Sequence, residues 1–361
     1  MAEFKVALHG ESTNEIDKQL EEILKNQRAR IKVFGIGGGG GNTLSRMKEL
    51  GIKGAEMIAL NTDAQDLLYT YADHKLLIGK DLASGTGAGS NPKVGEEAAK
   101  ESEHEIKELL ENSDMIFITC GLGGGTGSGG APVVAELSKK SGALTIGVVT
   151  MPFTIEGNKR YENAVYGLER LESYTDTLIV IPNDRLLDLA PELPLHTAFK
   201  VADEILTNAV KGISELVTKP GLVNLDFADI KTVMLGGGVA LIGVGEADSQ
   251  NRAQEAVEKA IENPLLDVKV DGASGALVNI IGGLDLSLKE ARQVIETVNK
   301  KLSPDAKLIW GAQISEDMDK TLKVMLIVTG VSSPQIIGTS ETRLDKKQQE
   351  ISDELGIEFV E

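Results

Sequence analysis

The chain has 361 residues, of which 41% are hydrophobic and 4% aromatic, so we expect two globular domains with cores of Val, Ile, Leu and Ala. The net charge of −18 argues against a nucleic-acid partner, because such binding uses clustered Lys and Arg. This charge does not exclude a nucleotide as ligand, because backbone N–H groups can hold phosphates without a net positive charge on the protein. The single cysteine, Cys120, excludes an internal disulfide and a cysteine-built metal cluster, and it fits a reducing cytoplasm. We find no run of about 18 apolar residues and no secretory signal, so we expect no direct membrane insertion.

Residues 1–30 are charged and are predicted to form a helical extension. Their apolar residues fall on one helical stripe: Ile16, Leu20, Ile23 and Leu24. Short apolar runs then alternate with helical patterns as far as residue 195. The predicted strands are 31–37, 56–62, 115–121, 144–152 and 177–183, and the predicted helices lie near 42–50, 94–112, 131–141 and 157–172. Continuous apolar strands between helices predict a doubly wound, Rossmann-like α/β domain with a parallel sheet over residues 31–195.

Residues 196–220 form the longest helical pattern, with a broad apolar face that predicts a central helix buried between two domains. A loop follows over 221–234, and residues 235–331 are predicted to form a smaller α+β domain. Its strands are expected within 233–247, 275–283, 306–314 and 321–331, with helices near 249–262 and 287–302. The tail, 332–361, is polar and charged, so we expect it to be mobile.

Three glycine-rich turns precede predicted helices: GIGGGGGN (35–42), SGTGAGSNP (84–92) and GLGGGTGSGG (121–130). The first fits the dinucleotide pattern G-x-G-x-x-G, but five consecutive glycines satisfy almost any glycine template, and a ligand-free turn stays open. The last lacks the lysine of a P-loop. Such turns would meet at the carboxyl edge of the sheet, where their N–H groups can surround three phosphates.

Six segments in order, GGGGGN, NTDAQ, GGGTGSG, IEGNKR, IPNDRLL and NLDFADI, resemble the signature loops of the FtsZ family. The match runs from about Ile31 to Val331. That family is the prokaryotic homologue of tubulin, a GTPase that polymerises head to tail into the cell-division ring. The N-terminal helix, FITCGLGGGTG and the short tail are more similar to its archaeal branch.

The resemblance implies a tubulin-like fold, GTP/GDP and Mg²⁺ as cofactors, and a second copy of the chain as partner. It also implies a cytoplasmic protein that assembles at the division site. A membrane anchor or division-ring proteins would be reached through the tail, 332–361.

The resemblance also implies which residues hold the phosphates. The first cradle would comprise Gly38, Gly39, Gly40, Gly41 and Asn42, and the second Gly121, Gly124, Gly125, Thr126 and Gly127. The third turn departs from the commoner GLGAG of the family at Thr86. Its remaining members, Gly85, Gly87, Ala88 and Gly89, would face the γ-phosphate.

Two further segments would contribute polar groups to the same site. Asp63 in NTDAQ would lie near Mg²⁺ or the γ-phosphate, although a turn residue after a strand is an equal alternative. In FTIEGNKR, Glu156 would accept from the ribose and Arg160 would reach the phosphates, whereas Arg160 alone would be a solvated helix residue. At the base, the resemblance assigns Asn183 and Asp203 to the guanine edge and Phe199 to the ring. A structural pairing of Asp203 stays open, because an acid inside so apolar a helix needs a partner.

The segment NLDFADI carries two acids at positions i and i+3, Asp226 and Asp229. Sequence alone favours helix capping. In the family this loop enters the GTP site of the next subunit, so the resemblance implies that Asp226 and Asp229 orient the attacking water and that Asn224 helps position it.

The histidines are scattered without metal-ligand spacing: His9, His74, His104 and His196. We expect Mg²⁺ to be held through the phosphates rather than by the protein. Two rival functions stay open: an NAD-dependent oxidoreductase, for which no histidine has a supporting motif, and a non-hydrolysing GTP-binding scaffold, against which the intact NLDFADI counts.

Overall fold

The computed structural model describes residues 29–189, 194–218, 221–223, 225–263 and 273–331. Residues 1–28 of the predicted N-terminal extension, the tail over 332–361 and Asn224 lie outside the described residues. None of the helices in the described ranges combines the length and apolar character needed to cross a bilayer.

Ten strands form one continuous sheet in the order β3-β2-β1-β4-β5-β6-β7-β10-β8-β9. In chain order they are β1 (Ile31–Ile36), β2 (Ala55–Asn61), β3 (His74–Leu77), β4 (Met115–Gly121), β5 (Leu144–Met151), β6 (Thr177–Pro182), β7 (Gly238–Ala247), β8 (Gly275–Gly282), β9 (Lys307–Ile314) and β10 (Leu322–Thr329). The strands from β3 to β6 pair in parallel, which confirms the predicted parallel sheet. Strand β7 extends the sheet by pairing in parallel with β6, and then antiparallel with β10.

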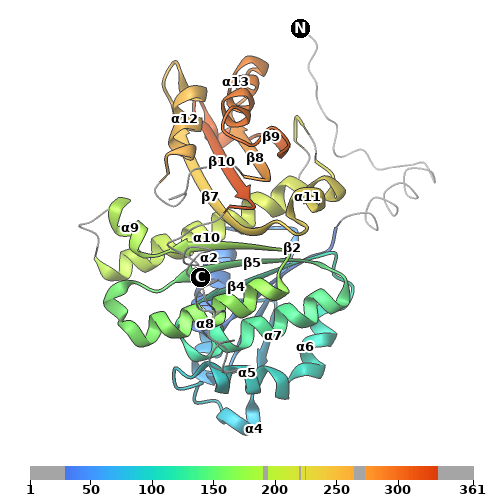
Figure 1. Cartoon of the computed structure of the whole chain (residues 1–361), viewed down its shortest axis with the longest axis vertical. Coiled ribbons are helices and arrows are strands. Elements are labelled where there is room, and N and C mark those ends of the chain that lie inside the picture. Colours follow the sequence, from blue (N-terminus) through green and yellow to red (C-terminus); the bar gives the residue numbers. More distant parts are fainter. Residues whose placement is uncertain (1–28, 190–193, 219–220, 224, 264–272, 332–361) are drawn as a thin grey trace, which may run out of the picture.

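The helices of the described residues surround this sheet (Figure 1). They are α2 (Gly37–Glu49), α3 (Ala64–Tyr69), α4 (Lys80–Ala83), α5 (Pro92–Glu101), α6 (Glu103–Leu110), α7 (Gly125–Ser141), α8 (Asn158–Tyr174), α9 (Asp184–Leu189), α10 (Leu195–Thr218), α11 (Phe227–Met234), α12 (Arg252–Ile261) and α13 (Leu288–Asn299).

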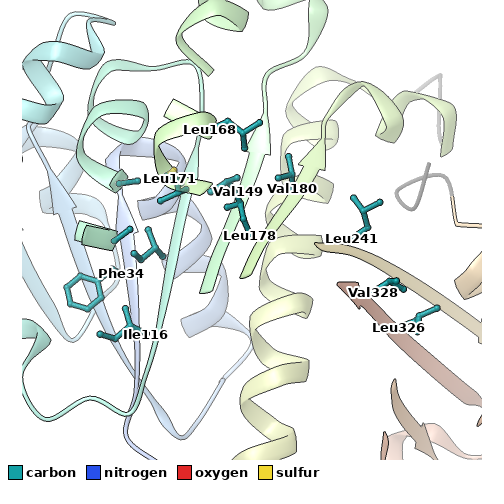
Figure 2. Close-up of a cluster of buried hydrophobic side chains, with 14 of the residues drawn as sticks. Phe34, Ile116, Val149, Leu168, Leu171, Leu178, Val180, Leu241, Leu326 and Val328 are labelled. Atoms are coloured by element: carbon teal, nitrogen blue, oxygen red, sulfur yellow. The ribbon is translucent and has the colours of Figure 1, made fainter. Parts of the chain in front are cut away.

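Helices cover both faces of the parallel strands, as continuous apolar strands require. Adjacent residues Val33 and Phe34 are both fully buried but belong to separate apolar clusters, one on each face. The Val33 cluster includes side chains of α2 and α10, and the Phe34 cluster includes side chains of α5, α6, α7 and α8. Figure 2 shows the second cluster running from Phe34 to Val328 and Leu326 of β10.

Helix α10 confirms the predicted central helix, and it packs against both α2 and β5. An ideal Cβ at Gly212 would stand 2.1 Å from the methyl carbon of Met325, so α10 also meets β10 closely. The helix therefore lies where the parallel strands give way to the antiparallel ones.

Several element boundaries differ from the sequence predictions. The segment predicted as one helix near 94–112 is two helices that meet at Ser102, and residues 233–234 end α11 rather than begin a strand. Strand β3 was not predicted, because its four residues include two exposed polar ones and it pairs only at the sheet edge.

Two of the three glycine-rich turns differ most from prediction, because their glycines form the first turns of helices. Helix α2 begins at Gly37 and α7 at Gly125, earlier than expected. Close backbone contact explains this: a Cβ at Gly40 would stand 2.6 Å from the carbonyl oxygen of Thr119, and one at Gly129 would stand 1.9 Å from that of Pro92. Without side chains, these helix starts can enter narrow spaces between neighbouring elements.

We expect Gly129→Ala to lower the free energy of unfolding by about 1–3 kcal/mol, because the methyl group would collide with the backbone of α5. Urea unfolding provides the measurement. The matched control is Gly130→Ala in the same helix, where the new Cβ would be 3.4 Å from its nearest neighbour, a methyl carbon of Ile36. That variant should be neutral or more stable by up to about 1 kcal/mol. Equal effects of the two substitutions would contradict the proposed close contact.

Candidate nucleotide-binding site

A cavity of about 330 Å³ lies at the carboxyl ends of β1, β4, β5 and β6, where α2 and α7 begin. Open α/β sheets bind ligands at this edge. The cavity wall includes thirteen of the residues assigned from the sequence: Gly38, Gly39, Asn42, Gly121, Gly124, Gly125, Thr126, Gly127, Glu156, Arg160, Asn183, Phe199 and Asp203.

One half of the cavity is built from the amino-terminal turns of α2 and α7. The first N–H groups of a helix have no partners within the helix and carry a partial positive charge, which suits an anion. As far as the described residues show, neither helix has a side-chain N-cap to occupy these groups. Two such helix starts side by side can hold consecutive phosphate groups.

Gly40 and Gly41 do not line the cavity, although the resemblance placed them in the first cradle. An ideal Cβ at Gly41 would stand 2.8 Å from the hydroxyl oxygen of Thr70, and Gly40 faces Thr119 as described above. Both positions face the protein interior. The structure therefore indicates that glycine is needed here for close packing. Their contact with phosphate stays a prediction.

The third turn, with Gly85, Gly87, Ala88 and Gly89, also does not line the cavity but lies behind its wall. The Ala88 methyl carbon is 2.8 Å from the position of an ideal Cβ at Gly125, which does line it. Backbone bonds tie the turn to the end of β2: the Gly87 N–H donates to the Thr62 carbonyl at 3.1 Å, and the Ala64 N–H donates to Gly85 at 3.0 Å.

Asp63 is the N-cap of α3 and is absent from the cavity wall. Its Oδ1 accepts from the backbone N–H groups of Gln65 and Asp66, at 2.9 and 3.0 Å. This is the turn role that the sequence left as an alternative. The other oxygen lies 3.8 Å from the position of an ideal Cβ at Gly87, so it is directed toward the third turn, and a role near Mg²⁺ stays a prediction.

Glu156 and Arg160 meet in the cavity wall. Arg160 Nη1 is 2.5 Å from Glu156 Oε2, and Glu156 Oε1 accepts from the Phe153 N–H at 2.9 Å. Both oxygens of Glu156 therefore have a protein donor. An incoming phosphate would compete with Glu156 for Arg160, and that exchange would free one Glu156 oxygen for a ribose hydroxyl.

The opposite end of the cavity holds two side-chain acceptors. Asn183 is 4% exposed, and its Oδ1 has no hydrogen-bond partner within the described structure. Asp203 is mostly enclosed, and burial raises the pKa of its carboxyl group to about 6. The hydrogen bond from Thr43 acts in the opposite direction and lowers this pKa. A buried acceptor without a partner, such as Asn183 Oδ1, indicates a missing donor. The guanine edge, with N1–H and N2–H₂, would supply such donors, and that contact stays a prediction.

An aromatic side chain lies beside these acceptors. Phe199 is 39% exposed and packs edge to face against Phe153, with ring centroids 5.1 Å apart. Its free face can stack on a flat ring. Phe153 and Thr43 support this end of the cavity, and neither was predicted from the sequence. Thr43 Oγ1 lies 3.2 Å from Asp203 Oδ1 across 160 residues of chain, and no local pattern could reveal that contact.

Asp226 and Asp229 form a capping box at the start of α11. The Asp229 N–H donates to Asp226 Oδ1 at 2.7 Å, and the Asp226 N–H donates to Asp229 Oδ2 at 3.3 Å. The capping role that sequence alone favoured is therefore present. Figure 1 places α11 on the side of the molecule opposite α9, which directly follows Asn183 of the cavity. Within one chain the two acids do not reach the cavity.

Among the described residues, the other reactive side chains give no alternative centre. Cys120 is fully buried, and burial raises the pKa of its thiol to about 12, so it is not a nucleophile at neutral pH. Across the described part of the chain, no three His, Cys, Asp or Glu side chains converge as metal ligands.

Comparison with known proteins identifies the family. A model of the Tubulin/FtsZ family, GTPase domain, matches residues 30–191, and one of the FtsZ family, C-terminal domain, matches residues 238–332. The cell division protein FtsZ 1 of Thermococcus kodakarensis is 60% identical over 91% of this chain and 88% of its own length. That of Archaeoglobus fulgidus is 55% identical over 99% of this chain and 95% of its own.

Solved structures agree with this assignment. The structure of an empty FtsZ dimer from M. jannaschii superposes with a TM-score of 0.84 at 59% identity, covering 88% of this chain and 93% of that one. CetZ2 from Haloferax volcanii, at 21% identity and a TM-score of 0.74, shares the fold. The predicted tubulin-like architecture is confirmed, and the chain belongs to the FtsZ family of cell-division GTPases.

Proposed function

We propose that this protein binds GTP with Mg²⁺ in the described cavity, polymerises head to tail, and hydrolyses GTP where the acidic loop of one copy closes the cavity of the next. The observation that carries the proposal is the separation of the two halves of the site. The cavity offers phosphate-binding and base-binding groups, while Asp226 and Asp229 lie on the other side of the molecule.

The length of α10 makes this separation unavoidable within one chain. Phe199 and Asp203 lie in its first turns, and the acidic loop follows its end. The helix has 24 residues, and at 1.5 Å per residue it is about 36 Å long. Because this rigid helix runs from the cavity residues toward the acidic loop, its length supports the proposal that a second copy supplies the acids.

The capping box supports catalysis rather than competing with it. Each of the two acids uses one oxygen to accept a backbone N–H group of the other, and both side chains are solvent-exposed. This holds the two carboxylates side by side and keeps one oxygen of each available to accept from a water molecule. Positioned acceptors of this kind orient a water for attack on phosphorus. We assign Asn224 to the same task on the family resemblance.

Exposed apolar side chains on both sides support head-to-tail association. Leu222 and Leu235 flank the acidic loop and are 64% and 56% exposed. Near the cavity, Ile155 and Tyr161 are 81% and 48% exposed. An interface between unlike surfaces of identical subunits continues into a filament. The FtsZ dimer structure from M. jannaschii shows self-association of a relative.

The residues present fit a nucleotide with Mg²⁺. The glycines of α2 and α7 leave the helix N-termini open to phosphates. Asn183 Oδ1 has no hydrogen-bond donor within the described structure and can accept one from a ligand. Mg²⁺ characteristically keeps several waters and binds substrate phosphates, where it would offset the charge that develops on them during hydrolysis. We place the protein in the cytoplasm at the division site. We propose that its tail, 332–361, reaches a membrane anchor or other division-ring proteins.

We expect Asp229→Ala to bind GTP and still form filaments but to lower phosphate release by about 10²-fold or more, because the attacking water loses an orienting acceptor. Phosphate release and light scattering are measured together after addition of GTP and Mg²⁺. Normal turnover in this variant would reject a catalytic role for Asp229.

The wild-type protein supplies the control for the shared site. Its phosphate release per subunit should rise steeply above a threshold protein concentration, because a filament contact completes each site. Specific activity that is flat with concentration would exclude hydrolysis at a shared site. GTP binding without any hydrolysis would favour a scaffold instead.

We expect Asp203→Asn to weaken GTP binding by about 10–100-fold and to favour XTP, because the amide donates to the 2-oxo group of xanthine and still accepts from N1–H. Competition against a fluorescent nucleotide measures both affinities. Asp73→Asn, a matched change in an ion pair with Lys48 at the surface, should leave the GTP/XTP preference unchanged. An unchanged preference in Asp203→Asn would exclude Asp203 from the base site.

GTP affinity should fall as the pH drops through about 6. The pKa of Asp203 is raised to about 6 by burial, so below that pH the carboxyl group is protonated and cannot accept from both guanine donors. The loss should approach tenfold per pH unit. GTP binding by Asp203→Asn provides the control for titration of the phosphates. The same pH dependence in both proteins would show that Asp203 is not the cause.

A further inference from the structure

A single buried amide connects two of the glycine-rich turns. Asn163 lies on α8 and is 6% exposed. Its Nδ2 lies 2.9 Å from the carbonyl oxygen of Ser90 and 3.3 Å from that of Gly123. Both partners are acceptors, so the amide must present its two hydrogens to them. One side chain therefore joins the third turn to the turn that leads into α7.

The backbone at both contacts has conformations that need support. Gly89 and Ser90 each have a φ of 57°, and Gly123 has a φ of 103°. A left-handed serine is uncommon and persists where the surroundings hold it in place. Asn163 donates to the carbonyl groups of Ser90 and Gly123, and these two hydrogen bonds stabilise both turns in the shape that surrounds the cavity.

Helix α8 is itself a firm support for this amide. A Cβ at Gly167 would stand 2.9 Å from Ser128, so α8 and α7 are in backbone contact. Ser128 Oγ accepts from the Gly123 N–H at 2.8 Å. The Gly123 peptide is thus held from α7 through its N–H and from α8 through Asn163.

The two turns meet behind Gly125 of the cavity wall. Gly125 lines the cavity, and Ala88 and Asn91 lie directly behind it, with the Asn91 N 2.8 Å from the position of an ideal Cβ at Gly125. Thr126 of the same wall shares a 2.7 Å hydrogen bond with Thr62 at the end of β2. A triphosphate that extends from Asp203 along the helix N-termini would bring its last phosphate to this wall.

We propose that Asn163 is a positioning residue that fixes the third turn against the α7 cradle and thereby sets the preference for GTP over GDP. The proposal rests on the proposed GTP site. Asn163 does not touch the nucleotide. It keeps the spacing of the two turns that would enclose the third phosphate, and neither of its two hydrogen bonds reaches the residues assigned to the base.

The test compares Asn163→Leu with Asn163→Ala. Leucine keeps the number and branching of the side-chain heavy atoms, although it is bulkier, and leaves both carbonyls without a donor. Alanine vacates space beside two carbonyls, and a water molecule can enter there and donate to both. We expect leucine to lower the ratio of GTP to GDP affinity on the order of tenfold and alanine to lower it less. GDP affinity should change little in either variant.

A role in packing alone predicts the reverse order, because alanine leaves a cavity whereas leucine fills it. Calorimetric titration with GTP and GDP in Mg²⁺ measures the ratio, and thermal unfolding with GDP bound reports whether each variant is folded. If Asn163→Leu does not fold, Asn163→Ala still decides, since its GTP/GDP ratio must fall below that of the wild type. An unchanged ratio, or equal losses for both nucleotides, would overturn the proposal.

Arg170→Met provides the matched control on the same helix. Arg170 Nη2 lies 2.8 Å from Glu96 Oε1, which links α8 to α5 without touching either turn. This variant should lose stability and keep the GTP/GDP ratio. Failure of the proposed function is distinguishable, because in that case the wild type would bind neither nucleotide, whereas failure of this inference leaves wild-type binding intact.

Discussion

The nucleotide side of this molecule depends on backbone contacts that only glycine permits. The first turn of α2 enters between β1 and β4, and the first turns of α7 lie against α5, in both places with no room for a Cβ atom. A Cβ at Gly95 would stand 2.2 Å from the carbonyl oxygen of Gly125, for example. The same missing side chains leave the helix N-termini open toward the cavity. Tight packing and the open helix N-termini are therefore two consequences of one property of the backbone.

Helix α10 has the complementary effect, because it keeps two parts of the chemistry apart. Its amino-terminal turns contribute Phe199 and Asp203 to the base end, and its carboxyl end leads to the acidic loop. The apolar face of the helix packs against α2 and β5, so the separation is rigid. Under the proposed function, a monomer has a nucleotide cavity that the two acids of its own chain do not reach, and assembly would bring the cavity of one copy to the acids of the next.

Much of the fold could be predicted because short stretches of the sequence have the apolar spacing of a strand or a helix. Buried parallel strands such as 115–121 are apolar at almost every position, and α10 repeats its apolar residues at helical spacing. Strand β3 lacked that signal, because an edge strand with His74 and Lys75 exposed has no buried face to reveal it. The pairing of β6 with β7 was equally invisible, since it joins residues 177–179 to 238–240 across the length of α10.

The sequence by itself determined the family, the parallel sheet, the three glycine-rich turns and the identity of most cavity residues, because these follow from local periodicity and from motifs in a fixed order. Only the tertiary structure decided how those residues are used. It showed Asp63 and the Asp226–Asp229 pair as helix caps, Gly40 and Gly41 as packing positions, and Thr43 and Asn163 as supports for residues far along the chain. The reason is physical: a hydrogen bond or a backbone contact depends on distances in space, and folding alone brings such distant segments together.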